Sequence, residues 1–234
     1  MLRPVGKQRV AEEIIVQLRG LILKGDYSVG QKLPPERRLA EELGVNRASL
    51  REAIKSLEQM GLVKTRQGDG TRVLDYMQTA GIDIISHLLP RDGQPNLDVL
   101  ADVFEFRRLY GRMVARFTAE RATAEDIAKL EAIAERAALC EEGEELLKID
   151  FEFYIGMTQA THNRVLQLLI NSIRPAVLSY SSFFAMFNPP APVVRKQHRD
   201  LIKAFQAREA DKAAQIIDTY LKRWSDQLNN LKPQ

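Results

Sequence analysis

The sequence of 234 residues contains a single cysteine and no long apolar run. Because Cys140 has no second cysteine to pair with, the cysteine content gives no indication of an oxidising compartment. A helix that crosses a bilayer needs about 20 consecutive apolar residues, and no stretch approaches that length. The N-terminus also lacks the apolar stretch of a secretory signal. We therefore expect a cytoplasmic protein without a membrane partner.

The sequence also lacks the patterns that are typical of catalytic centres. It has no nucleophile paired with a base, no glycine-rich phosphate loop and no complete set of metal ligands. We therefore predict that the chain is not an enzyme and that it needs no cofactor.

The few surplus positive charges lie in the first third of the chain. Residues 1–75 have 14 lysines and arginines against 10 acidic residues, whereas residues 76–234 have 20 against 21. Phosphate contacts require cations, so this distribution favours nucleic acid as the partner of the first third.

The first 75 residues have the pattern of a winged helix-turn-helix. Apolar residues recur at helical spacing from Val10 to Ile22, and a second helix is expected at about 35–43. Gly44 fits a left-handed C-terminal cap, and Asn46 fits the N-cap of a third helix at about 47–60. Two β-prone runs at 62–66 and 71–74 then predict a hairpin, the wing.

The remainder predicts helices. After a connecting segment at 76–96, with a helix at its centre and a loop from 90, the periodicity indicates helices at about 97–119, 123–140, 145–160, 163–186, 193–207 and 209–230. No strand is expected beyond residue 75. The predicted fold is mainly α, with an N-terminal winged helix-turn-helix (1–75), a connecting segment (76–96) and a C-terminal all-α bundle of six to seven helices (97–234).

The helix that begins after Asn46 is the expected DNA-reading element, because the N-terminal residues of the second helix of such a motif enter the major groove. Arginine can bind a guanine edge with two hydrogen bonds, and small polar groups hold phosphates. The alternative is a solvated helix face followed by an ordinary hairpin. The expected DNA-contacting residues are Arg37, Asn46, Arg47, Ser49, Arg51, Gln67, Gly68 and Thr71.

Residues 8–75 resemble the GntR family of bacterial regulators. The resemblance rests on the segments 30–37, 43–53, 57–63 and 68–71. It implies a homodimer on a pseudo-palindromic DNA operator, with Arg37, Arg47 and Arg51 in contact with DNA. It also implies that Gly68 at the wing enters the minor groove.

The helical remainder is similar to the FadR branch of that family, in the segments 79–85, 149–163 and 183–189. This resemblance implies that long-chain acyl-CoA is the effector, that its binding releases the protein from DNA, and that the targets are genes of fatty-acid metabolism.

Many members of the wider branch bind a divalent metal through one Asp and three His. Asp150 and His198 match two of these ligands, whereas Tyr154 and Tyr220 stand where histidines would be. Phenols are poor ligands for ordinary divalent metals at neutral pH. We therefore expect no metal; if one binds, its ligands are Asp150 and His198.

Arg107 matches an arginine of the branch's effector cavity and would suit a carboxylate, a phosphate or a thioester-bearing ligand. The alternative for Arg107 is a buried structural ion pair, and late aromatic residues are either cavity lining or core. The expected effector-binding residues are Arg107, Asp150, Tyr154, Phe183, His198, Tyr220 and Trp224.

The sequence therefore predicts a repressor or activator of transcription whose operator affinity is set by a ligand in the helical domain. Long-chain acyl-CoA is the leading effector, and a small organic acid, with or without a metal, is the first alternative. An enzyme using Asp150, His198 and Arg107, and an architectural protein without a ligand, are the remaining alternatives.

Overall fold

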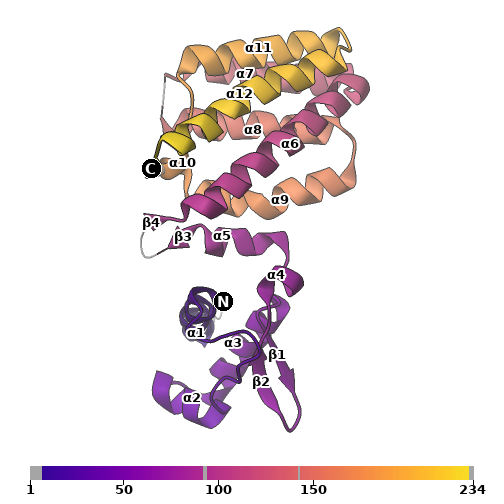
Figure 1. Cartoon of the computed structure of the whole chain (residues 1–234). Helices are drawn as coiled ribbons and strands as arrows, with labels where there is room; N and C mark the ends of the chain where they lie inside the picture. The colour runs from indigo at the N-terminus through magenta and orange to yellow at the C-terminus, as the bar shows by residue number, and fades with distance from the viewer. Residues whose placement is uncertain (1–6, 92–93, 142, 232–234) are drawn as a thin grey trace, which may run out of the picture. The chain divides into compact units, whose positions relative to one another are not determined.

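The computed structural model describes residues 7–91, 94–141 and 143–231 and is mainly helical, as predicted (Figure 1). The chain divides into two compact units, residues 1–84 and 85–234. This division falls inside the segment that we expected to connect two domains. Among the described residues, no helix is both long and apolar enough to cross a membrane.

Three helices form the body of the first unit: α1 (Lys7–Lys24), α2 (Glu36–Leu43) and α3 (Arg47–Gln59). The apolar stripe of α1 packs against α3. Leu18 from α1 and Leu50 and Leu57 from α3 are almost completely buried between them. This burial fixes which face of α3 points outwards.

The turn between α2 and α3 has the predicted caps. Gly44 adopts φ 64°, and the backbone N–H of this residue donates to carbonyl groups at the end of α2. Two residues later, Asn46 Oδ1 accepts the backbone N–H of Ser49 at 2.9 Å. Pro35, expected in the first turn of α2, stands one position earlier, at its N-cap.

The wing is the antiparallel pair β1 (Val63–Arg66) and β2 (Gly70–Val73), with Val63 opposite Val73. The segment before α2, residues 30–33, pairs with the free edge of β2 like a third, irregular strand. Gly30 N–H donates to Val73 O at 2.9 Å, and Leu33 N–H donates to Thr71 O at 2.9 Å. Strand β2 therefore has a hydrogen-bonded neighbour on each of its two edges.

The chain after the wing returns to the end of α3. In α4 (Tyr76–Thr79), the Thr79 hydroxyl donates to the carbonyl of Gly61 at 2.6 Å. Gly61 has φ +73°, and a Cβ at this position would lie 2.4 Å from Thr79 O. Only glycine fits here without displacing α4. A single 3-10 turn, η1 (Ile82–Ile84), ends the unit.

The second unit is a helical bundle. Its elements are α5 (Ile85–Leu88), β3 (Pro90–Arg91), β4 (Gln94–Pro95), α6 (Leu97–Arg121), α7 (Ala124–Leu139), α8 (Glu144–Ala160), α9 (Arg164–Ser179), α10 (Ser181–Ala185), α11 (Ala191–Gln206) and α12 (Ala210–Leu231). Figure 1 shows α6 and α12 crossing the bundle side by side, and they form its largest helix–helix contact.

Two sequence predictions for this unit were wrong. Residues 90–95 contain the short β3–β4 pair, although no strand was expected beyond residue 75. A pair of two-residue strands is too short to produce a periodic pattern. The helix expected at 163–186 is two helices, because Tyr180 departs from helical geometry. Pro175, inside α9, cannot donate a helical hydrogen bond and weakens the preceding turn.

The core of the bundle lies between α6, α8, α11 and α12. Phe153, Leu201 and Ile217 are completely buried within it. Gly111 allows α6 and α12 to approach closely, since a Cβ there would lie 2.8 Å from Leu221 Cδ1. Thr118 donates to the Met157 carbonyl at 2.8 Å and ties α6 to α8. These contacts hold α6, α8, α11 and α12 in fixed register. Each of the four helices contributes a side chain to the buried site described below.

We expect Gly61→Ala to destabilise the first unit by about 3 kcal/mol, through left-handed backbone strain and collision with α4. Gly68→Ala is the matched control: its φ is +80°, but nothing lies within 4 Å of the added Cβ, so about 1 kcal/mol is expected. Urea unfolding measures the loss, and hydrogen exchange locates it. Equal losses in the two variants would show that the α4 contact adds nothing.

Candidate functional site

The N-terminal end of α3 is exposed and positively charged. Asn46, Arg47 and Ala48 are all exposed, and Arg47 forms no ion pair with any residue that the structure describes. The buried stripe of α3 and the Asn46 cap fix the direction in which this end points. A guanidinium group is therefore presented to solvent on a rigid element.

Two further predicted arginines flank this end of α3. Arg51 binds Glu36 across α2 and α3 (Nε–Oε2 2.7 Å), and Arg37 lies 3.5 Å from Glu41 within α2. Their side chains are 64% and 75% exposed, respectively. Exposed ion pairs contribute about 0–1 kcal/mol, so a phosphate can replace these carboxylates at little cost.

Two predicted DNA-contacting side chains are not at the surface. Ser49 is buried within α3, because its side chain lies on the face that packs into the unit. Thr71 is buried at the middle of the wing, where its hydroxyl lies 3.0 Å from that of Thr65. The structure therefore places these two hydroxyls away from the exposed surface of the unit.

The tip of the wing is exposed at Gln67 and Gly68, as predicted. Behind it, Asp69 binds Arg72 (Oδ2–Nε 2.7 Å) and also pairs with Lys32. The Arg72 guanidinium and the Lys32 ammonium together hold the pKa of the Asp69 carboxyl well below its usual range. Both cations thus hold the wing in shape. Arg66, which was not among the predicted residues, ends β1 in an exposed position beside the tip.

The second unit contains a buried polar cluster centred on Asp150 of α8, whose side chain is completely buried. Its Oδ1 lies 2.9 Å from His198 Nε2 of α11, and its Oδ2 accepts the Tyr220 hydroxyl of α12 at 2.9 Å. Four helices meet here, because Arg107 of α6 lies 3.9 Å from Oδ2. The structure thus brings together residues that are 113 positions apart in the chain, from Arg107 to Tyr220.

Arg107 is held by aromatic rings rather than by a close carboxylate. Its Cζ lies 4.0 Å from the centre of the Trp224 ring and 5.1 Å from that of Tyr154. Its contact with Asp150 is longer than a hydrogen bond. The Arg107 side chain as a whole is 22% exposed.

Three buried polar atoms of this cluster have no hydrogen-bond partner among the described residues. They are the Tyr154 hydroxyl, His198 Nδ1 and Trp224 Nε1. Buried polar groups in native proteins are nearly always paired with protein, water or a ligand. His198 is also fixed by stacking on Phe153, with ring centres 4.0 Å apart. The cluster therefore has hydrogen-bonding groups that are free to bind a ligand and that are held in place by the surrounding side chains.

The cluster does not fit a divalent metal. Burial raises the pKa of Tyr154 and Tyr220 well above the usual value, and Asp150 raises both further, so both remain neutral phenols. Both oxygens of Asp150 are already engaged. Within residues 7–91, 94–141 and 143–231, no group of three or more His, Cys, Asp or Glu could hold a metal ion.

The late aromatic residues pack against one another beside this cluster. Trp224 contacts Phe104 and Phe187, with ring centres 5.5 Å and 6.2 Å apart. Phe183, predicted to bind effector, contacts Phe187 at 5.3 Å and Phe184 at 5.8 Å. Phe183 thus belongs to the aromatic core next to the polar cluster, whereas the other six predicted residues lie in the cluster itself.

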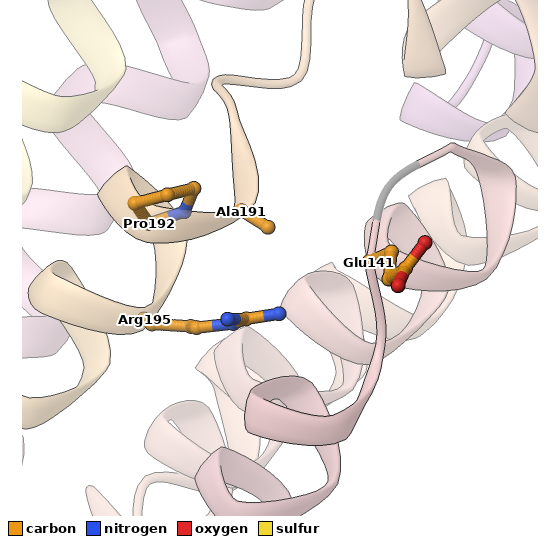
Figure 2. A pocket seen from close by; sticks show the side chains of 4 residues that line it. All are labelled: Glu141, Ala191, Pro192 and Arg195. Carbon is orange, nitrogen blue, oxygen red and sulfur yellow. The ribbon is translucent and has the colours of Figure 1, made fainter.

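A separate open pocket lies where α7 and the start of α11 approach each other. It is lined by Glu141, Ala191, Pro192 and Arg195 (Figure 2). Arg195 donates to the carbonyls of Cys140 (2.7 Å) and Ala137 (3.3 Å) and so caps the end of α7. None of the predicted effector residues lines this pocket. Its arginine, Arg195, instead stabilises the C-terminal end of α7.

Two family models match this chain. Residues 10–73 match the model of bacterial regulatory proteins of the gntR family, and residues 102–223 match the FCD domain. The chain belongs to the GntR family. Its first unit is the family's helix-turn-helix domain with a small β wing. Its second unit contains the FCD domain, which is built of α-helices throughout the described part of residues 102–223.

Individual proteins agree with this family assignment. The HTH-type transcriptional regulator Mce2R of Mycobacterium tuberculosis (strain CDC 1551 / Oshkosh) is 43% identical over 120 residues, which are 51% of this chain. The match spans 50% of that relative, about half its length. The galactonate operon transcriptional repressor of Escherichia coli (strain K12) is 30% identical over 219 residues, covering 90% of this chain and 93% of that protein.

A solved structure agrees in fold alone. Lar, described as controlling the expression of the Listeria monocytogenes agr system, has a TM-score of 0.62 and 18% identity. The match covers 99% of this chain and 100% of that chain.

We expect Asp150→Asn to destabilise the FCD domain by about 3 kcal/mol, since the amide NH2 would face a donor and Arg107 would lose its counter-charge. Asp218→Asn, at the half-exposed ion pair with Arg108, is the control, with a loss of about 1 kcal/mol. Urea unfolding followed by circular dichroism measures both. A loss at Asp150 no larger than that at Asp218 would contradict the assignment of Asp150 as the centre of the cluster.

Proposed function

We propose that this GntR-family protein is a transcriptional regulator that binds double-stranded DNA as a homodimer, without catalytic activity. The observation that supports DNA binding is Arg47 at the N-terminal end of α3, which is exposed and has no ion pair with any described residue. In a helix-turn-helix protein, that end lies in the major groove. Exposed Arg37 and Arg51 lie on either side, where they would contact the phosphate backbone.

The wing supplies the second contact in this proposal. Gly68 is exposed with φ +80°, and nothing lies within 4 Å of the position of its missing Cβ. A tip without a side chain can approach a groove closely, and Gln67 and Arg66 beside it supply polar and positive groups. The proposed DNA-contacting residues are Arg37, Asn46, Arg47, Arg51, Arg66, Gln67 and Gly68.

We expect Arg47→Ala to weaken specific DNA binding at least about tenfold, because one arginine–guanine pair contributes about 1–3 kcal/mol. The probe is a double-stranded sequence selected by the purified protein from a random library, and fluorescence anisotropy gives the affinity. Arg223→Ala, an exposed arginine on α12, is the matched control and should leave affinity unchanged. Unchanged affinity in folded Arg47→Ala would exclude this end of α3 as the reading element.

For the effector, we infer that the cluster around Arg107 binds a small organic acid. The guanidinium of the partly exposed Arg107 can bind a carboxylate, and the Tyr154, His198 and Trp224 atoms that have no partner among the described residues can bond polar groups of the same ligand. Buried and polar on several sides, the cluster suits a compact polar molecule. The relative named for the galactonate operon supports this choice, since galactonate is a polyhydroxylated carboxylate.

Long-chain acyl-CoA, the effector implied by the FadR branch, is the second candidate. Such a ligand requires an apolar channel for its acyl chain, next to the residues that bind its thioester. Here Phe104, Phe187 and Trp224 contact one another in edge-on and stacked geometry and fill the space next to Arg107. An acyl chain would have to displace these rings. We therefore place the small acid first.

The effector would act by changing the geometry of the dimer. DNA half-sites lie about one helical turn apart, so two α3 helices held at another distance no longer fit both. A ligand shifts this equilibrium only by as much as it prefers one geometry over the other. Because α6, α8, α11 and α12 each contribute to the cluster, a ligand there can change how these helices pack.

We expect Arg107→Ala to raise the Kd of the active acid at least about tenfold, because a charge-assisted bidentate pair is lost. Arg108→Ala is the matched control, since the neighbouring Arg108 is directed to Asp218 instead. Isothermal titration calorimetry with galactonate and other sugar acids, and separately with palmitoyl-CoA, gives the affinities.

Release of the selected DNA by palmitoyl-CoA but by no sugar acid would replace the small acid with the acyl-CoA effector. If neither class binds, the effector proposal fails while the DNA-binding proposal stands.

A further inference from the structure

Three side chains outside the Asp150 cluster also have buried polar atoms without a hydrogen-bond partner among the described residues. They are Arg174 of α9, at Nε, and two amides, Asn188 before α11 and Gln197 within α11, at both amide atoms. Native proteins retain few such atoms, because an unsatisfied buried donor or acceptor costs free energy. All the buried side-chain atoms of this kind among the described residues lie in the second unit. This concentration indicates one region that needs a further binding partner.

Arg174 lies on the inward face of α9. It follows buried Ile170 by four positions and precedes Val177, which packs against the core, by three, so the three side chains share one face of the helix. Arg174 forms no ion pair with a described residue. The positive charge of its guanidinium is therefore not balanced by a carboxylate of the described part of the chain.

Helix α9 runs antiparallel to α6. Tyr110 of α6 donates to the Leu166 carbonyl of α9 at 2.8 Å. Beyond the end of α9, the Phe184 ring lies 6.5 Å from that of Phe104, which is earlier in α6 than Tyr110. The part of the chain between Leu166 and Phe184 therefore passes the part of α6 between Phe104 and Tyr110.

Arg107 and Arg174 occupy the middle of these two parts. Arg107 is three positions from either end of its part, and Arg174 is eight positions after the start and ten before the end of the other. The two arginines therefore lie at about the same level of the bundle. Two guanidinium groups so placed can bind one small anion from two sides.

The two amides are next to residues of the same region in the chain. Gln197, which is 4% exposed, directly precedes His198 of the cluster. Asn188 directly follows Phe187, whose ring lies 6.2 Å from that of Trp224. An amide both donates and accepts hydrogen bonds, as a hydroxyl group does, whereas an alkyl chain would leave the amide atoms without partners. The amides therefore favour a hydroxylated ligand.

The charges of this extended site determine the charge of its ligand. The cations are Arg107 and Arg174, and the anion is Asp150, so one positive charge is in excess when His198 is counted as neutral. An anion that is removed from water needs a compensating charge. One carboxylate on the ligand balances the excess, whereas a second carboxylate would have no counter-charge.

We propose that Arg174, Asn188 and Gln197 extend the Asp150 cluster into one effector site, whose ligand is a polyhydroxylated monocarboxylate. The carboxylate of the ligand binds between Arg107 and Arg174, and its hydroxyl groups bind the two amides. The proposal rests on the proposed function, because it adds residues and a ligand class to the site proposed there for a small acid.

Arg174→Ala should raise the Kd of galactonate at least about tenfold, because the carboxylate loses one of its two guanidinium partners. Arg164→Ala, at an exposed arginine of the same helix, is the matched control and should bind galactonate like the wild type. Isothermal titration calorimetry of the full chain measures both. An unchanged Kd in Arg174→Ala would overturn the role of Arg174.

Two further probes test the ligand class with the wild-type chain. Galactarate has the carbon skeleton of galactonate with a second carboxylate, and hexanoate has one carboxylate without hydroxyl groups. Each should bind at least about tenfold more weakly than galactonate. Equal or tighter binding of galactarate would overturn the single charge of the ligand, and equal or tighter binding of hexanoate would overturn the recognition of hydroxyl groups.

Asn188→Leu and Gln197→Met each replace an amide by an apolar side chain of similar size. Each should weaken galactonate binding at least about fivefold, because a hydrogen bond to the ligand is lost. The urea midpoint of the ligand-free chain should stay the same or rise, because polar atoms without partners are removed. Gln206→Met is the matched control: Gln206 of α11 donates to Glu131 at 2.9 Å, and galactonate binding should not change.

The two measurements together separate a ligand-binding role from a structural one. Lower urea midpoints in both amide variants would show that the amides stabilise the fold, and would overturn the proposal. Galactonate binding that Arg107→Ala weakens, but that Arg174→Ala and both amide variants leave unchanged, would overturn the extended site and leave the proposed function intact. If no sugar acid binds the wild type, the extended site and the small-acid effector fail together, while DNA binding stands.

Discussion

A fully buried carboxylate determines the organisation of the FCD domain. Asp150 cannot be hydrated, so neighbouring helices must supply hydrogen bonds and positive charge. His198, Tyr220 and Arg107 do so from α11, α12 and α6, and the helix register in the core places them there. The same requirement explains why the site is polar at the centre of an apolar bundle. The helices α6, α8, α11 and α12 are thus coupled through one buried carboxylate.

The helix-turn-helix domain has a different constraint, which is the orientation of one helix end. Gly44 ends α2, Asn46 begins α3, and the buried leucines of α3 set its rotation. The wing is fixed independently, through Asp69 and the strand-like segment before α2. Two short elements therefore present their tips without support from a large core.

Sequence reasoning located the elements of the helix-turn-helix well because their signals are local. A cap such as Asn46 or a left-handed glycine such as Gly44 is recognised from its neighbours alone. The burial of Ser49 and Thr71 was missed because a short polar side chain gives no periodic signal of its own. The break at Tyr180 was missed since the apolar pattern continues across it. The members of the Asp150 cluster were named from a resemblance, and no local rule predicts that Arg107 would rest on Trp224 and Tyr154 rather than on Asp150.

The stacking of Arg107 on Trp224 has a practical consequence. Trp224 is the only tryptophan in the sequence, and its indole ring is buried beneath the guanidinium at 4.0 Å. The emission of an indole is sensitive to a charge at such a distance and to the hydration of its ring nitrogen. Any molecule that draws Arg107 away, or that bonds Nε1, alters that emission. The protein therefore carries an intrinsic optical probe at its own candidate ligand site, which allows compounds to be screened without a label.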